Sequence, residues 1–377
     1  AVFDPEAAQI INSLNWSDLL LPDRLVDLLR RRASPEVFWQ EVRSAWIAQT
    51  RPLTDAAQLT ALAQRTHELL DAHCDRSLDF IPVIHDVIGR AFLPTVVSGL
   101  STRDQGLVLA DQTFKVRGLL ATEPTTLSWR QRLADIWVQI RAGQVVRREL
   151  RGRARGTRSR QLDLTDPIVD LLPRLGMDRA VDAVTGVLTA IAGPPGAAAT
   201  ALLYALAKYP EERSRVEEEL AALPFEEIVA APTRRAPATH RFIKEVLRLW
   251  SPTPLANREV RKEIVCPYAK LHVGQQYLLS PDLQHHDPRF WHEPERFDPD
   301  RWLAAQQRPR ASGAYVPFGW APRACIGSSL ATSHLILLAH ALATRYRLEV
   351  EDPTALKMAL FSVPTPRNFR GTLTRRS

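Results

Sequence analysis

The chain has 377 residues, of which 45% are hydrophobic, and a formal net charge of +7. This length and composition allow a large buried core, in one large α-rich domain or in two ordinary ones. The three cysteines, Cys74, Cys266 and Cys325, are far apart and lack CxxC spacing, which argues against a disulfide framework and a structural zinc site. Without an apolar leader or a run of about 18 apolar residues, the sequence predicts a cytoplasmic protein with no membrane span.

Apolar residues recur at helical spacing through most of the chain, whereas strand-like alternation is rare. The spacing predicts helices over 35–49, 58–72, 166–176, 177–192, 239–250 and 328–346. The strand-like runs are 257–265, 270–279 and 346–352, in the part of the chain after residue 250 where Pro is concentrated. Because there is no internal repeat and no low-complexity linker, we expect a single domain, 1–377, that is mainly α with small β-sheets.

The N-terminal region does not show the strand pattern. Residues 1–34 are rich in Leu and Arg, and the first long helix follows them. In that helix Trp39 and Arg43 are one turn apart and share a face. Taken alone, the pair indicates a core tryptophan beside a solvated arginine.

The segment from Arg147 to Arg160 carries seven arginines against one acidic residue. A nucleic-acid site is one interpretation of such a segment. The segment lacks interleaved aromatic residues and lies between two helical patterns, which favours a solvated, mobile loop between helices. We therefore expect no nucleic-acid partner.

Two consecutive prolines interrupt the apolar segment 184–206, which otherwise predicts a long buried helix. Pro194 and Pro195 lack the N–H groups of a regular helix, and their rings clash with the preceding turn. The sequence therefore predicts a kink or an opened turn here, with freed backbone carbonyls beside Gly196.

Glu245 and Arg248 are three residues apart in the expected helix 239–250, so they project from the same face. Such a pair is usually a surface ion pair that contributes a few tenths of a kcal/mol.

Cys325 lies where an irregular segment with Pro and Gly, starting at Pro317, runs into a helix expected to begin near Ile326. Free N–H groups at a helix N-terminus stabilise a thiolate. Gly319 and Gly327 permit a flat ligand to approach the backbone closely. The alternative is a buried, unreactive cysteine at the start of a helix.

This segment resembles the F-x-x-G-x-R-x-C-x-G heme loop of the cytochrome P450 family. The matching residues are Phe318, Gly319, Arg323, Cys325 and Gly327. Ala321 occupies the usual place of the first glycine, so the turn has to be made with Pro322 and a neighbouring glycine. The resemblance implies a P450 fold that binds heme b, with an N-terminus that is either truncated or has a reduced first sheet. It implies that Cys325 is the thiolate ligand of the iron, with Phe318, Arg323 and Gly327 also contacting the cofactor.

Other motifs match the family in the right order over roughly residues 35–377. Glu245, Arg248 and Arg296 resemble its structural Glu-Arg-Arg triad, which lies behind the heme loop. Arg43 and Arg258 resemble the arginines that bind the heme propionates, and Trp39 resembles the tryptophan that assists them. Charge-assisted hydrogen bonds suit such contacts, since they are stronger than neutral ones.

The long distal helix departs from the family pattern, in which a small-residue pair precedes an acid and an alcohol that relay protons. Ala192 and Gly193 match the small pair. The residues after it have no proton-donating side chain, and Thr200 lies one turn further on; these residues are Pro194, Pro195, Gly196 and Ala197. Two interpretations are open, namely that ordered water supplies the protons or that the reaction needs no relay.

The resemblance implies a monooxygenase of a small or medium organic substrate in specialised metabolism. The alternatives are a heme-thiolate isomerase, dehydratase or peroxide-using enzyme, and a non-catalytic heme-binding or carrier-interacting protein. Leu255, Ala256 and Phe361 are expected in the substrate pocket. A ferredoxin or another acidic electron carrier is the expected partner, at a basic surface that includes Arg31, Arg32, Arg43 and Arg323.

Overall fold

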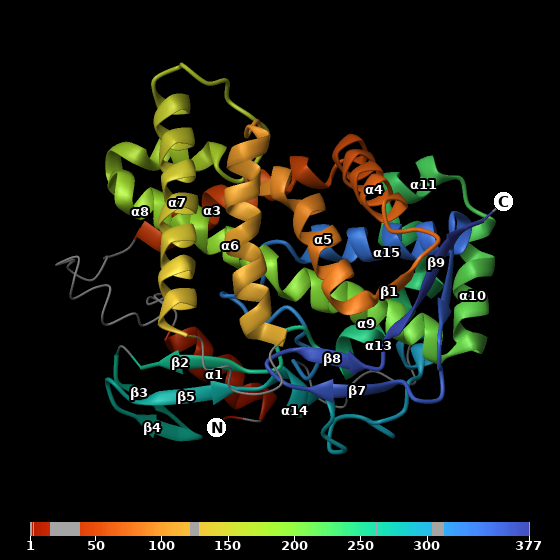
Figure 1. Ribbon diagram of the computed structural model, residues 1–377. Coiled ribbons are helices and arrows are strands. Elements are labelled where there is room, and N and C mark those ends of the chain that lie inside the picture. The colour runs from red at the N-terminus through yellow and green to blue at the C-terminus, as the bar shows by residue number, and fades with distance from the viewer. Residues whose placement is uncertain are drawn as a thin grey trace.

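The computed structural model describes residues 2, 4–15, 38–120, 128–260, 262–303 and 313–376, in which helices predominate (Figure 1). The predicted helices are all present, in some cases as parts of longer ones. The helices of the first half are α1 (Pro5–Leu14), α3 (Phe38–Thr50), α4 (Ala56–Asp71), α5 (Phe80–Val96), α6 (Thr102–Leu120) and α7 (Trp129–Ala154). Those that follow are α8 (Asp166–Ala192), α9 (Pro194–Lys208), α10 (Pro210–Ala221), α11 (Phe225–Ala230), α12 (Pro232–Arg235), α13 (Pro237–Leu249), α14 (Pro281–His285) and α15 (Ser328–Thr344), with the short 3-10 turns η1 (Pro52–Thr54) and η2 (Pro299–Trp302).

The core forms where α5, α9 and α15 pack together. Ile88, Leu202 and Ile336, one from each helix, are completely buried and belong to one apolar cluster. A second cluster joins α3, α7 and α8. The stretch from Asp166 to Lys208 is long and apolar enough to cross a membrane by length and composition alone, but 67% of its apolar window is buried inside the protein. A core helix of a globular protein has the same property.

The strands form small antiparallel sheets, most of them after residue 250 as predicted. They are β1 (Ser77–Asp79), β2 (Ala256–Glu259), β3 (Ile264–Cys266), β4 (Ala269–Leu271), β5 (Gln276–Leu279), β6 (Tyr346–Val350), β7 (Lys357–Leu360), β8 (Pro364–Arg367) and β9 (Arg370–Arg375). The three-stranded sheet has the order β1-β9-β6, and β2-β5, β3-β4 and β7-β8 are pairs. In the β2-β5 pair Arg258 lies opposite Tyr277, which fixes the position of this arginine.

The N-terminal residues pack against the later sheets. Asp4 caps α1 by accepting hydrogen bonds from the N–H groups of Glu6 and Ala7. Val2 forms an isolated parallel bridge with Leu279 of β5. Residues 16–34, the rest of the region without a strand pattern, lie outside the described ranges.

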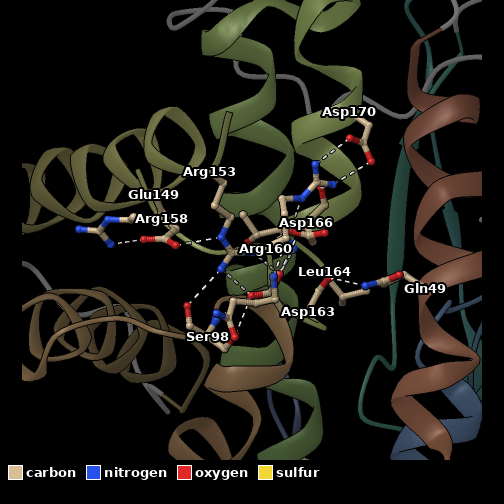
Figure 2. Close-up of polar contacts among 12 residues, drawn as sticks. Gln49, Ser98, Glu149, Arg153, Arg158, Arg160, Asp163, Leu164, Asp166 and Asp170 are labelled. Carbon is tan, nitrogen blue, oxygen red and sulfur yellow. Dashed lines mark hydrogen bonds and ion pairs between the residues drawn. The ribbon is translucent and has the colours of Figure 1, made fainter. Parts of the chain in front are cut away.

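Only the second half of the arginine-rich segment, residues 155–160, is the solvated loop that its composition predicts. Residues up to Ala154 continue α7, and the side chain of Arg153 is fully buried. Its guanidinium donates to Glu149 Oε1 at 2.9 Å and to Asp163 Oδ2 at 2.7 Å (Figure 2). Arg160 pairs in turn with Asp166 and Asp170. The prediction was wrong for Arg153 because the neutralising aspartates follow the segment in the sequence and return to it only in the folded chain.

Candidate functional site

Cys325 lies at the end of the loop that precedes α15, residues 316–327, which we name the Cys loop. Its backbone N–H donates to the carbonyl of Phe318 at 2.8 Å. The helix begins at Ser328 and not near Ile326, so Cys325 precedes the first turn. The Cys325 side chain is exposed at the surface of the loop. Desolvation by the surrounding atoms raises the pKa of its thiol, while the backbone N–H of Gly327 and the charge of Arg43 oppose this rise. The predicted thiolate-stabilising groups thus lie beside it.

The turn of the Cys loop is made at Gly319 and Pro322. Gly319 has a φ of +76°, a conformation that favours glycine, and its N–H donates to the carbonyl of Val316 at 3.0 Å. The Ala321–Pro322 peptide bond is cis. The left-handed residue of the turn is thus Gly319, the neighbouring glycine, and not position 321.

Residues from the N-terminal part of the chain hold the Cys loop. Arg43 of α3 donates to the carbonyl of Ala324, and Arg323 donates to the carbonyl of Asn15. From α1, Gln9 donates to the carbonyl of Ala321 at 3.0 Å. Trp39 lies in the first turn of α3, but its side chain is outside the described set. Arg43 therefore reaches the predicted ligand loop.

Arg258 supplies an observation that tests whether heme fits this site. Its guanidinium lies on β2 and donates to the carbonyl of Asn257 at 3.0 Å, whereas its buried Nε has no hydrogen-bond partner among the described residues. Burial lowers the pKa of Arg258. A half-buried cation with an N–H group to spare suits an anionic group such as a propionate. Together with a cysteine at the start of a helix, these residues fit heme b.

Glu245 and Arg248 form a buried ion pair on α13, and not the surface pair that an isolated motif suggests. Both side chains are completely buried, with Arg248 Nη2 2.8 Å from Glu245 Oε1. Arg248 Nη1 also donates to the carbonyls of His285 at 2.8 Å and Pro294 at 2.7 Å. The pair is thus tied to the irregular segment that leads to the Cys loop.

The third arginine of this cluster is Arg301, and the prediction of Arg296 was wrong. The Arg296 side chain is 65% exposed and pairs with Glu293, while its backbone carbonyl accepts a bond from Arg248. Arg301, in η2, is only 4% exposed and donates from Nε to Glu245 Oε1 at 3.3 Å. Its neighbour Trp302 donates to the other oxygen at 3.0 Å. The sequence feature that could have identified Arg301 is the arginine next to a tryptophan in DPDRW, residues 298–302.

His285 links the ion pair to the Cys loop. None of the sequence motifs predicted a role for this residue. The N–H of Val316 donates to His285 Nε2 at 2.9 Å. The proton is therefore on Nδ1, which donates to the carbonyl of Arg248 at 3.0 Å. Complete burial lowers the pKa of His285 to about 3, so the ring is neutral. A neutral ring is required, since a protonated Nε2 could not accept the bond from Val316.

The distal helix is broken at Gly193, between the end of α8 at Ala192 and the start of α9 at Pro194. His85 of α5 packs into the break. A Cβ atom on Gly196 would lie 2.4 Å from His85 Nδ1, which is buried without a hydrogen-bond partner. Burial lowers the pKa of His85 to about 4, and a hydrogen bond to the backbone of Ala192 opposes this. An imidazole thus occupies the space of a side chain at position 196.

The remaining site candidates are less closely defined. The Thr200 hydroxyl is buried and donates to the carbonyl of Gly196 at 2.8 Å. Leu255 is 54% exposed just before β2, where Ala256 is half-buried. Phe361 is half-buried in the turn after β7, with the Arg367 guanidinium 5.1 Å from its ring centroid.

Comparisons with known proteins show which sequences and folds the chain is similar to. Residues 188–369 match the family model of cytochrome P450. The chain is 34% identical over 155 residues to the cytochrome P450 monooxygenase alnD of Emericella nidulans, covering 38% of this chain and 27% of that protein. It is 36% identical over 162 residues to cytochrome P450 4A10 of Mus musculus, covering 42% and 31%. The chain thus aligns with less than a third of the length of these relatives.

Solved structures match over most of the chain. A retinoic acid-bound cyanobacterial CYP120A1 has a TM-score of 0.75 at 19% identity, covering 91% of this chain and 80% of that one. A zebra fish cytochrome P450 with progesterone has a TM-score of 0.77 at 18% identity, covering 99% and 93%. These likenesses establish the mainly helical P450 fold. Residues 188–369 thus match the cytochrome P450 family, and the chain as a whole has the P450 fold.

Proposed function

We propose that the protein is a heme-thiolate monooxygenase of a small or medium organic molecule, as in specialised metabolism. The observation that carries the proposal is the position of Cys325 before α15, in a loop held by Arg43 and linked by His285 to the buried pair on α13. Cys325 would bind the iron of heme b, and Arg43 and Arg258 would hold its carboxylates. Thiolate-bound heme would supply oxygen activation, since electron donation from the sulfur favours O–O cleavage.

Replacing the cysteines one at a time tests the ligand assignment. Cys325→Ser should abolish the red-shifted carbon monoxide band of the ferrous protein, because that band requires a thiolate ligand. Cys266→Ser is the matched control, since Cys266 is a free, half-buried cysteine in β3 and should leave the band unchanged. Persistence of the band in Cys325→Ser would contradict the assignment.

The distal helix favours a second candidate, an isomerase, dehydratase or peroxide-using enzyme that needs no reductive oxygen activation. Pro195 and Gly196 carry no proton donor, and the Thr200 hydroxyl donates to a backbone carbonyl. Assays without reductant and without oxygen separate the candidates. Turnover that persists without both, and without peroxide, contradicts the monooxygenase, whereas a strict requirement for both contradicts the second candidate.

An acidic electron carrier such as a ferredoxin is the partner that we propose for the monooxygenase. The net charge of +7 supports it. Of the basic residues expected at the docking surface, Arg43 donates to the carbonyl of Ala324 and Arg323 to the carbonyl of Asn15. The other two, Arg31 and Arg32, lie outside the described residues. Reduction of the protein by an acidic carrier should slow steeply as salt is added. A rate independent of salt would contradict the docking proposal.

A further inference from the structure

The N-terminal half of α7 exposes large apolar side chains that the heme site does not use. Their exposed fractions are between 51% and 66%, in a helix whose C-terminal half is partly buried. We name them the α7 stripe: Trp129, Leu133, Ile136, Trp137 and Ile140. Scattered exposed apolar residues are normal, but five along three turns of one helix require an explanation.

The α7 stripe lies on one face of the helix. At 3.6 residues per turn its five residues fall within an arc of about 100°. The buried residues of the C-terminal half, such as Val145, Glu149 and Arg153, are centred on nearly the opposite face. Therefore the stripe points away from the side by which α7 packs on the protein. Figure 1 shows α7 beside α6 at one side of the molecule.

Arginines border the stripe on both sides. Arg130 and Arg141 follow one edge and Arg132 the other, and all three are exposed. The guanidinium of Arg130 lies 5.3 Å from the Trp129 ring centroid, and that of Arg141 lies 4.9 Å from the Trp137 ring centroid. Asp135 is the only acidic residue in this half of the helix. The face is apolar in the middle and cationic at its edges.

We propose that the α7 stripe docks on an anionic lipid surface, with the helix axis parallel to the membrane plane. Tryptophans and aliphatic side chains would enter the boundary between head groups and acyl chains, and the arginines would contact lipid phosphates. A second copy of the chain suits the face less well. In a two-fold contact the stripe would meet itself, which brings the arginines at its edges close to those of the other copy.

Vesicle sedimentation with the full-length, heme-loaded protein tests this inference. We expect binding to phosphatidylcholine vesicles that contain anionic phosphatidylglycerol, weaker binding to phosphatidylcholine alone, and a decrease with added salt. Trp137→Glu should weaken binding at least about tenfold, because it places a charge in the apolar face. Arg130→Glu should also weaken binding, by about tenfold, because it reverses a charge at the edge.

Matched controls make the same chemical changes elsewhere on the surface. Val265→Glu changes an apolar residue of β3 that is 67% exposed, and Arg347→Glu changes an exposed arginine of β6. Both should bind vesicles like the unaltered protein, with melting temperatures showing that every variant is folded. Absence of vesicle binding, or equal losses in the controls, overturns the proposal. Self-association that Trp137→Glu abolishes, without vesicle binding, also overturns it and assigns the stripe to a second copy.

Discussion

Arg301 and Arg296 are five residues apart, but their environments differ completely. Arg301→Ala removes a buried partner of Glu245 and should lower the free energy of unfolding by about 3–5 kcal/mol, with loss of heme during purification. Arg296→Ala removes an exposed partner of Glu293 and should cost at most about 1 kcal/mol. Chemical denaturation and the heme content of the two purified variants measure this difference. Equal losses in both variants would contradict the assignment of Arg301 to the buried cluster.

The contact between His85 and Gly196 predicts a non-additive pair of substitutions. Gly196→Ala places a methyl group within 2.4 Å of the imidazole, and overpacking of this kind costs about 1–3 kcal/mol. In a His85→Ala background the same substitution should cost much less, because the ring is absent. A double-mutant cycle on the free energy of unfolding measures the coupling. Additive effects would mean that the ring does not fill the break.

At the scale of elements, Arg153 joins the C-terminal end of α7 to the start of α8 and to the chain after α5. Its Nη2 donates to the carbonyl of Ser98 at 3.1 Å as well as to Asp163 (Figure 2). Arg153→Ala leaves the buried carboxylates of Glu149 and Asp163 without this cation.

We therefore expect Arg153→Ala to lower the free energy of unfolding by about 3–5 kcal/mol. Arg151→Ala, at an exposed position of the same helix, should change it by less than about 0.5 kcal/mol. Thermal and urea unfolding of the two variants provide the comparison. A stable Arg153→Ala protein would show that the carboxylates are solvated in its absence.

The elements that the sequence predicted well are those whose patterns are local. Helical spacing found α13 and α15, and a three-residue separation placed Glu245 and Arg248 on one face. By contrast, Arg296 and Arg301 lie in an irregular segment, where only tertiary packing decides which side chain turns inward. His85 and Gly196 pack together although they are 111 positions apart in the sequence, and no local pattern connects them. Arg153 was misjudged for the same reason.

At the scale of the molecule, buried neutral histidines should make the protein sensitive to acid. Burial lowers the pKa of His334 to about 3, as it does for His285, and that of His85 to about 4. An unfolded chain binds these protons below its ordinary pKa of about 6.5. Because the folded protein does not bind them until about pH 4, the free energy of unfolding should fall as the pH falls through this window.

Denaturation at several pH values between about 7 and about 4.5 measures this dependence. His334→Gln should reduce its slope, since one fewer proton is then taken up on unfolding. A stability that is constant across this range would contradict the neutral, buried state of these rings.

The bonds between α1 and the Cys loop also affect the order in which the site is completed. Gln9 and Ala321 are separated by 312 positions in the chain. Contacts over such distances raise the contact order, and they form only after a large loss of chain entropy. During synthesis Gln9 emerges before Ala321 and meets it only after the intervening residues have been made. The loop that carries Cys325 therefore gains its support from α1 only after the residues between them have been synthesised.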